Sequence, residues 1–142
     1  MPLSTAEREA FLAEPHIGSL AVARPEKDRA PLVVPVWYGY RPGGEPWVLI
    51  FADSVKARLM ADTGRFSLLA ERVTPTVRYV SVEGPIVSTE ATTDDEHRTM
   101  VERYLPPESA AVYLERAANE VGRQITVRMR PEHWFSADLG AV

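Results

Sequence analysis

The 142-residue sequence contains no cysteine. This absence excludes disulfide bonds, thiolate nucleophiles, iron–sulfur clusters and cysteine-ligated zinc sites. Any redox chemistry would therefore have to come from a bound cofactor. Lysine is scarce as well: Lys27 and Lys56 are the only two among 16 basic residues, and the others are arginines.

Long apolar runs are also missing, since no stretch approaches the roughly 20 residues that a transmembrane helix needs. The N-terminal segment has neither the apolar core nor the cleavage site of a signal peptide, so we expect a cytoplasmic protein without a membrane partner. The net charge of −4 argues against nucleic-acid binding, because neutralising phosphates requires a clustered basic face.

Six segments have the apolar character of β-strands, and 142 residues suit a single domain spanning 1–142. The segments are His16–Ala23, Ala30–Tyr40, Trp47–Ala52, Arg65–Glu71, Thr76–Glu90 and Arg123–Arg130. Short turns and few intervening helices favour an antiparallel barrel over a doubly wound parallel sheet. The predicted fold class is therefore α+β, mainly β, with six antiparallel strands and short flanking helices.

Local signals predict four short helices. Capping boxes at Ser4–Glu7 and Thr93–Glu96 each open one helix. A third helix begins after Ser54 and ends at Gly64, and the pair Pro106-Pro107 begins a fourth that Gly122 stops.

The segment Ala30–Tyr40 is apolar on both faces of the predicted strand. Such a strand is usually buried on both sides, for example between a barrel interior and a partner subunit. Pro35 cannot donate a ladder hydrogen bond. It therefore marks a bulge, a sheet edge or a place where the backbone meets something other than a neighbouring strand.

The most informative stretch for chemistry begins at Ser54 and contains Lys56 and Arg58. Two cations in the first turn of a short helix add to the partial positive charge and free N–H groups already present there. A bound phosphate would bring the Ser54 hydroxyl, the free amides and both cations together. The alternative is that Lys56 and Arg58 are solvated surface residues, and these residues alone leave both interpretations open.

The same stretch, Ser54-Val55-Lys56-Ala57-Arg58-Leu59, is similar to the Ser-Arg-Lys-Gly-Arg-x-Leu phosphate segment of the pyridoxamine 5'-phosphate oxidase-like split-barrel superfamily. Arg78–Gly84 resembles that family's Arg-Gln-Val-Arg-Val-Glu-Gly strand. The blocks Gly18–Val22, Pro35–Tyr38 and Arg65–Leu68 match patterns of its smaller members. The resemblance therefore extends over most of the first two thirds of the chain.

This resemblance implies a homodimer of six-stranded split barrels that binds FMN or F420 at the dimer interface. It implies that Val34, Pro35, Val36 and Trp37 run along the flavin ring, with Tyr79 also near the ring. Ala52 and Ser54 would approach the ribityl-phosphate tail, while Lys56 and Arg58 would hold the phosphate.

Three departures from the family pattern limit the function that the resemblance implies. Val55 stands where the oxidase has an arginine, and Pro35 lies in the strand where the oxidase supplies contacts to the ring and the phosphate. The segment Arg130–Phe135 lacks the oxidase's closing Arg-Leu-x-Pro signature. We therefore expect an FMN- or F420-dependent oxidoreductase that transfers hydride to or from a small organic substrate, not a true pyridoxamine phosphate oxidase. No catalytic side chain is predicted, because the cofactor carries the chemistry. One alternative is a non-catalytic module that stores or senses flavin or haem. Another is a barrel that has lost its site and acts only as an interaction domain.

The three histidines, His16, His97 and His133, are scattered and lack metal-ligand spacing, so no metal site is predicted. We interpret each as a surface or capping residue. In the haem alternative, His133 is the candidate axial ligand because Trp134 and Phe135 follow it.

Overall fold

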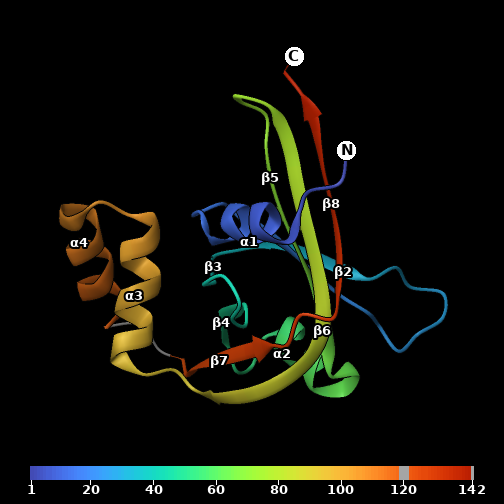
Figure 1. Ribbon diagram of the computed structural model, residues 1–142. Coiled ribbons are helices and arrows are strands. Elements are labelled where there is room, and N and C mark those ends of the chain that lie inside the picture. Colours follow the sequence, from blue (N-terminus) through green and yellow to red (C-terminus); the bar gives the residue numbers. More distant parts are fainter. Residues whose placement is uncertain (119–121, 142) are drawn as a thin grey trace.

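The computed structural model describes residues 1–118 and 122–141, which form eight strands and four helices (Figure 1). The helices are α1 (Thr5–Ala13), α2 (Val55–Thr63), α3 (Asp94–Tyr104) and α4 (Pro107–Ala117). The strands are β1 (Gly18–Val22), β2 (Leu32–Val36), β3 (Tyr38–Gly39), β4 (Trp47–Phe51), β5 (Arg65–Arg72), β6 (Val77–Ala91), β7 (Gln124–Met129) and β8 (His133–Gly140).

All eight strands join in one antiparallel sheet that curls around the core. Its hydrogen-bonded path runs β2-β1-β5-β6-β7-β4-β3, and β8 pairs with β6 beside this path. The long strand β6 curves through the molecule in Figure 1: its first part pairs with β5 and β8, and its last part pairs with β7. The two ends of the path, β2 and β3, are separated in the chain by Trp37 alone.

The predicted class, α+β and mainly β with antiparallel strands, is confirmed, but the count of six strands is wrong. The predicted strand Ala30–Tyr40 divides at Trp37 into β2, which pairs with β1, and β3, which pairs with β4. Its ladder is interrupted where the N–H of Tyr38 donates to the hydroxyl of Tyr104, at 3.1 Å. Strand β8 was not predicted at all.

The predicted helix starts are confirmed. In α1 the Ser4 hydroxyl accepts from the Glu7 N–H while the Glu7 carboxylate accepts from the Ser4 N–H, and Thr93 and Glu96 repeat this capping box in α3. Gly64 ends α2 with a φ of 71°, a left-handed conformation that glycine adopts without a steric penalty. The predicted stop of the last helix at Gly122 follows residues 119–121, which lie outside the described part of the chain.

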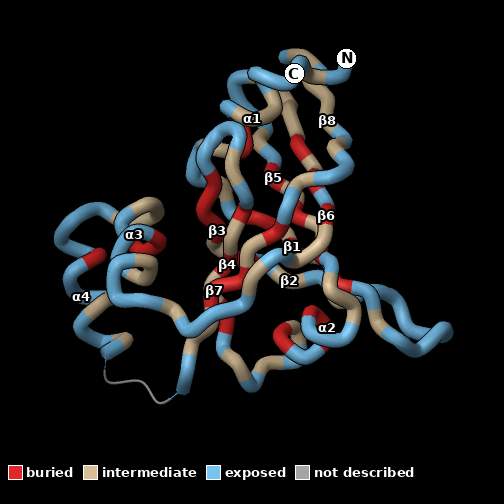
Figure 2. Tube along the Cα trace, turned by 60° about the horizontal axis from the view of Figure 1, so that its bottom comes forward, coloured by how far each residue is buried: buried red, intermediate tan, exposed pale blue. Residues whose placement is uncertain are grey.

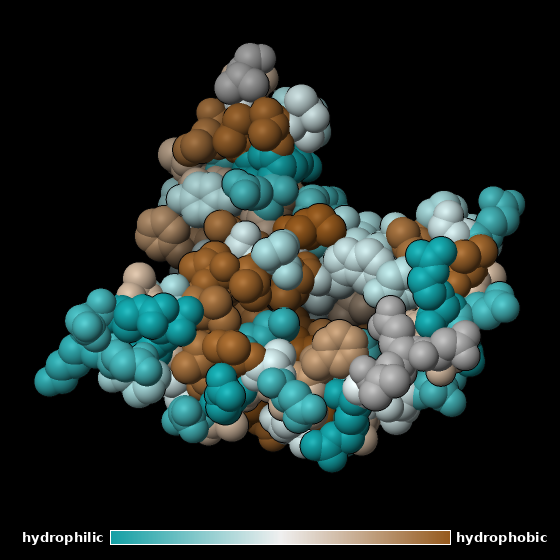
Figure 3. Space-filling view, turned by 180° about the vertical axis from the view of Figure 1, so that it is seen from behind, coloured by the Kyte–Doolittle hydropathy of each residue, from teal (hydrophilic) through white to brown (hydrophobic). Residues whose placement is uncertain are grey.

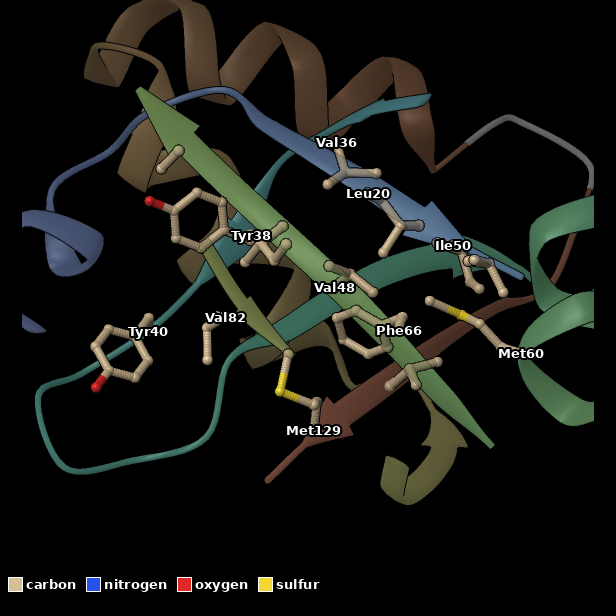
Figure 4. Close-up of a cluster of buried hydrophobic side chains, with 14 of the residues drawn as sticks. Leu20, Val36, Tyr38, Tyr40, Val48, Ile50, Met60, Phe66, Val82 and Met129 are labelled. Carbon is tan, nitrogen blue, oxygen red and sulfur yellow. The ribbon is translucent and has the colours of Figure 1, made fainter. Parts of the chain in front are cut away.

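The core fills the inner side of the curled sheet, where the red segments of Figure 2 converge. Figure 4 shows Leu20, Val48, Phe66 and Val82 pointing into one cluster, and Met60 of α2 completes it. These side chains are buried, and burial of apolar surface is the main source of stability for a sheet protein.

The side of the sheet that faces away from the core carries both apolar and polar residues. Register pairing aligns Pro35, Ser19, Leu69, Ser81 and Phe135 across β2, β1, β5, β6 and β8 on this side. We call it the outer face. Hydrophobic side chains gather over the middle of the molecule when it is seen from behind (Figure 3).

Strand β2 tests the prediction that both sides of this strand are buried. Val36 is buried and Val34 packs against the core, whereas Val33 on the outer face is 62% exposed. The predicted burial of the inner side of this strand is therefore confirmed. Its outer side is exposed in the single chain. Pro35 lies in the strand that ends the hydrogen-bonded path, so its reading as an edge residue is confirmed.

Candidate functional site

A pocket of about 250 Å³ opens between the end of β2, the end of β4 and the helices α3 and α4. We call it the Trp37 pocket. It brings together four of the predicted cofactor residues, Pro35, Val36, Trp37 and Lys56. The other lining residues come from four elements: Leu49, Ile50, Phe51, His97, Met100, Val101, Tyr113 and Gln124. The wall combines apolar side chains with the polar groups of Lys56, His97 and Gln124, and a small cavity of this kind is a candidate small-molecule site.

The first turn of α2 lies at this pocket and carries positive charge. Ser54 is the N-cap, and Lys56 is the second helical residue. The backbone N–H groups of Val55 and Lys56 donate no hydrogen bond to any described residue. Free amides at a helix start, together with a lysine side chain, favour an anion at this place.

The Ser54 hydroxyl is already engaged in capping the helix. It donates to the carbonyl of Phe51 at 2.7 Å and accepts from the N–H of Ala57 at 3.2 Å. Its single proton is therefore in use, and donation to a phosphate would require it to leave Phe51.

Arg58 and Ala52 line a different cavity, of about 420 Å³, on the other side of α2. Residues two apart in a helix point to different sides, so Lys56 and Arg58 do not face one pocket. Arg123, the residue before β7, also lines this cavity, and its carbonyl accepts from the N–H of Ala52 at 2.9 Å. We call this cavity the Arg58 pocket.

The indole of Trp37 is held by the helical hairpin. It stacks on Tyr104 of α3, with ring centroids 4.9 Å apart, and contacts Tyr113 of α4 at 5.6 Å. The hydroxyl of Tyr104 also donates to the carbonyl of His16 at 2.7 Å. The helices thus fix the wall of the Trp37 pocket through Trp37.

Two predicted cofactor residues lie away from both pockets within the single chain. The side chain of Val34 packs against the core. Tyr79 lies on the outer face of β6, where its ring stacks on Phe135 with a centroid distance of 6.2 Å. One copy of the chain therefore does not bring Tyr79 to the Trp37 pocket.

A third cavity, of about 520 Å³, adjoins the Trp37 pocket and contains none of the predicted residues. It lies between the last residue of β4, the first residue of β7 and the helices α3 and α4. We call it the α3–α4 pocket. Phe51, His97 and Gln124 line both cavities. His97, predicted as a surface or capping residue, is half-buried at this shared wall. The spacing between Phe51, His97 and Gln124 in the sequence carries no periodic signal, so a shared pocket wall could not be predicted from it.

Glu96, the neighbour of His97, fastens the start of α3 to β7. One carboxylate oxygen accepts from the Thr93 N–H and the Thr126 hydroxyl, and the other lies 2.6 Å from the Arg128 guanidinium. Partial burial opposes ionisation, but the hydrogen bonds from Thr93, Arg128 and Thr126 outweigh it, so the pKa of Glu96 is lowered. The ionised carboxylate of Glu96 thus attaches α3, the helix that carries His97, to β7.

Among residues 1–118 and 122–141, no three His, Asp or Glu side chains gather as a metal site would require. Within the same residues, no helix has the length and apolar character needed to cross a membrane.

No protein-family model and no curated protein sequence matches this chain. Solved structures do match. A conserved hypothetical protein from Mycobacterium tuberculosis is 26% identical with a TM-score of 0.70, covering 96% of this chain and 85% of its own. A protein named as an F420 reductase is 21% identical with a TM-score of 0.68, covering 89% of this chain and 94% of its own.

Three further similar structures carry names that point to cofactors. A candidate pyridoxamine 5'-phosphate oxidase from Listeria innocua is 11% identical with a TM-score of 0.65, covering 93% of this chain and 96% of its own. An FAD-binding protein from Mesorhizobium loti and a heme binding protein from Mycobacterium smegmatis have TM-scores of 0.58 and 0.61. The chain thus has the fold of the pyridoxamine 5'-phosphate oxidase-like proteins. The resemblance predicted from the sequence is confirmed at the level of the fold.

Proposed function

We propose that the protein is an oxidoreductase that binds FMN or F420 in the Trp37 pocket and transfers hydride to or from a small organic substrate. One observation carries the proposal. The apolar stretch Pro35–Trp37 and the cation Lys56 line the same cavity of about 250 Å³. A flavin-type cofactor needs this pair of features, an apolar wall for a flat ring and a positive group for a phosphate.

The residues of the pocket fit such a cofactor. Lys56 and the free amides of Val55 and Lys56 would hold the phosphate, while Val36 and Trp37 would flank the ring. When bound, the cofactor supplies the hydride donor or acceptor. The chain's own task is to orient the ring and keep water away from it, which Met100 and Val101 would do from α3.

We further propose that the protein is a cytoplasmic homodimer of split barrels. The two copies would associate through the outer face. Val33 and Phe135 on this face are 62% and 71% exposed, and large apolar side chains exposed on one face favour association. A second copy seated there would bring its own Tyr79 toward the ring site, which Tyr79 cannot reach within one chain.

The choice between FMN and F420 rests on the tail of the cofactor. Arg58 and Arg123 line the Arg58 pocket, next to the start of α2. A cofactor tail with more negative charge than a single phosphate would interact with these two arginines as well as with Lys56. The single phosphate of FMN would need no cation other than Lys56. Both cofactors therefore remain part of the proposal.

A parallel titration of the purified protein with FMN and with F420, followed by ligand fluorescence, tests the proposal. We expect saturable binding of one of them, weakened tenfold or more in Lys56→Ala, because charge-assisted hydrogen bonds contribute about 1.5–3 kcal/mol. Lys27→Ala is the matched control, since Lys27 is the other lysine and lies in the exposed β1–β2 loop. Absence of binding by both cofactors would rule out the oxidoreductase.

Haem binding without catalysis is the second candidate, and the similarity to a heme binding protein favours it. The ligand would then be His97, which lines the Trp37 pocket, and not His133. The side chain of His133 is 69% exposed and lines none of the cavities described above. A Soret band that disappears in His97→Ala would favour haem over the flavin-type cofactors.

A further inference from the structure

A further cavity, of about 320 Å³, opens between α1, the turn that joins β3 to β4 and the segment that joins β7 to β8. We call it the Trp134 pocket. None of its lining residues lines the Trp37, Arg58 or α3–α4 pocket. The indole of Trp134 packs against the core, on the opposite side of β8 from Phe135. The pocket is therefore separate from the proposed cofactor site and from the outer face.

Arg8 reaches this pocket from α1 and has no counter-ion. Its guanidinium lies over the Trp134 ring, 4.5 Å from the centroid. The Nε atom is buried without a hydrogen-bond partner, and the guanidinium makes no ion pair with any described residue. Buried N–H donors are rarely left unpaired, because nothing then compensates for the water that they lose. Such a donor on a residue that lines a cavity indicates an acceptor in that cavity.

The contact with Trp134 orients Arg8 without using its donors. A cation–π contact uses the face of the guanidinium, whereas the N–H groups point outward from its edge. The planar fork of these N–H groups matches the two oxygens of a carboxylate. Arg8 is therefore held in a position that suits a carboxylate ligand.

The acidic residues of the pocket argue against a simple anion. Glu9 and Glu45 line it together with Arg8. The Oε1 atom of Glu9 accepts from the Tyr40 hydroxyl at 3.0 Å and from the Gly43 N–H at 2.6 Å, which leaves its Oε2 atom without a described partner. Glu45 is exposed and makes no hydrogen bond or ion pair with the described residues. An anion would face two carboxylates here, whereas a positive group would find unused acceptors.

Two other polar groups at the wall are already engaged. Burial and the hydrogen bond to Glu9 raise the pKa of Tyr40 to about 12, so its hydroxyl keeps the proton that it donates to Glu9. The Arg130 guanidinium is largely exposed and lies 3.7 Å from the Glu132 carboxylate. Arg8 and the unused carboxylate oxygens are thus the groups that remain for a ligand.

We propose that the Trp134 pocket binds a free amino acid in its zwitterionic form. The carboxylate of the amino acid pairs with the Arg8 guanidinium, and its ammonium group donates to Glu45 and to the free oxygen of Glu9. Its side chain packs on Pro131, which is half-buried at the wall. A cavity of about 320 Å³ lies at the lower end of the range for small-molecule sites, which favours a single amino acid over a peptide.

The test uses three probes that share one branched carbon chain. Leucine carries both charges, 4-methylpentanoate carries the carboxylate alone, and 3-methylbutylamine carries the ammonium group alone. Binding is followed by NMR of the arginine Nε–H groups, with the Arg8 signal assigned by its loss in Arg8→Lys. We expect leucine to shift the Arg8 signal and to bind about fivefold more tightly than 4-methylpentanoate, as one exposed charge pair would give. The amine should bind more weakly than leucine and leave the Arg8 signal in place.

Two variants assign the two charges to their partners. Arg8→Lys keeps the positive charge but removes the fork, and should weaken leucine and 4-methylpentanoate alike, by about tenfold or more. Glu45→Gln should weaken leucine about fivefold and leave 4-methylpentanoate unaffected. Glu45 makes no contact on which the fold depends, so this variant should fold as the parent does. Glu26→Gln is the matched control, since Glu26 is exposed in the β1–β2 loop, and it should change the affinity of neither probe.

Three results would overturn the proposal. They are an Arg8 signal that does not move with leucine at about 10 mM, equal affinity of leucine and 4-methylpentanoate, and leucine binding that survives Arg8→Lys unchanged. The proposed function depends on other residues, so the two fail separately. Lys56→Ala should leave leucine binding unchanged, and Arg8→Lys should leave the FMN or F420 titration unchanged.

Discussion

The Trp37 indole and the Tyr104 phenol ring stack with their centroids 4.9 Å apart and their planes inclined by 13°. Trp37 belongs to the break between two strands, and Tyr104 is the last residue of α3, 67 positions later in the chain. The stack therefore joins the sheet to the helical hairpin at the wall of the proposed cofactor site.

The hydroxyl of Tyr104 should contribute measurably to stability. It accepts from the Tyr38 N–H at 3.1 Å and donates to the His16 carbonyl at 2.7 Å, so Tyr104→Phe leaves two part-buried backbone groups unpaired. We expect the free energy of unfolding to fall by about 1–3 kcal/mol in urea denaturation. Tyr113→Phe is the control, because the Tyr113 hydroxyl bonds no described residue, and its free energy should stay within about 0.5 kcal/mol of the parent. Equal effects of both substitutions would contradict this role of the Tyr104 hydroxyl.

The carboxylate of Glu96 should matter far more than that of its neighbour Asp95. Glu96→Gln weakens the contact with Arg128 and the cap on Thr93, and should lower the free energy of unfolding by about 2 kcal/mol. Asp95 makes an exposed ion pair with Arg98, so Asp95→Asn should change it by less than about 0.5 kcal/mol. Denaturation of the two variants side by side measures this difference. An unchanged free energy of unfolding in Glu96→Gln would show that the contacts of the Glu96 carboxylate do not contribute to stability.

Strand β8 should confer an acid-sensitive part of the stability through Asp138. Hydrogen bonds from the Gly140 N–H, the Thr76 hydroxyl and the Arg78 guanidinium lower the pKa of Asp138 from 3.8 to about 2. Because the folded pKa lies below the unfolded one, this stabilisation is present above 3.8 and is lost as the pH falls toward 2. The difference in unfolding free energy between the parent and Asp138→Asn should therefore shrink over that range. A difference in unfolding free energy that stays constant down to about pH 2 would contradict this role of Asp138.

The outer face should carry the dimer contact. Val33→Asp places a charge on the outer face, in the edge strand β2, and should convert the protein to a monomer in light scattering, because an unpaired charge is costly to bury. Val112→Asp, at a valine of α4 that is similarly exposed, should leave the oligomeric state of the parent unchanged. A parent protein that is monomeric at micromolar concentration, or a Val33→Asp protein that remains dimeric, would refute the dimer.

Local signals in the sequence predicted the helix starts well. The capping boxes at Ser4 and Thr93 and the cap at Ser54 each form as expected, since the groups involved lie within three residues of one another. Strand β8 escaped prediction because its residues Ser136, Ala137 and Asp138 have low strand propensity, and only pairing with β6 makes them a strand.

The site was less predictable than the fold because it is assembled from distant parts of the chain. Lys56 and Trp37 could be named from local pattern and resemblance, and they do line one pocket. The contributions of His97 and Gln124 depend on how the α3–α4 hairpin folds back on the sheet, which no local periodicity encodes. The separation of Lys56 from Arg58 likewise follows from the orientation of α2 between two cavities.

The most direct test of the central claim compares each cofactor with its phosphate-free counterpart, in the parent protein and in Lys56→Ala. FMN is paired with riboflavin, and F420 with the deazaflavin nucleoside that lacks the phosphate tail; Kd is measured by fluorescence. The account predicts that Lys56→Ala weakens the phosphorylated cofactor about tenfold or more and leaves its phosphate-free counterpart almost unaffected. Equal weakening of both ligands, or no weakening of either, would contradict a phosphate site at Lys56 and with it the proposed cofactor pocket.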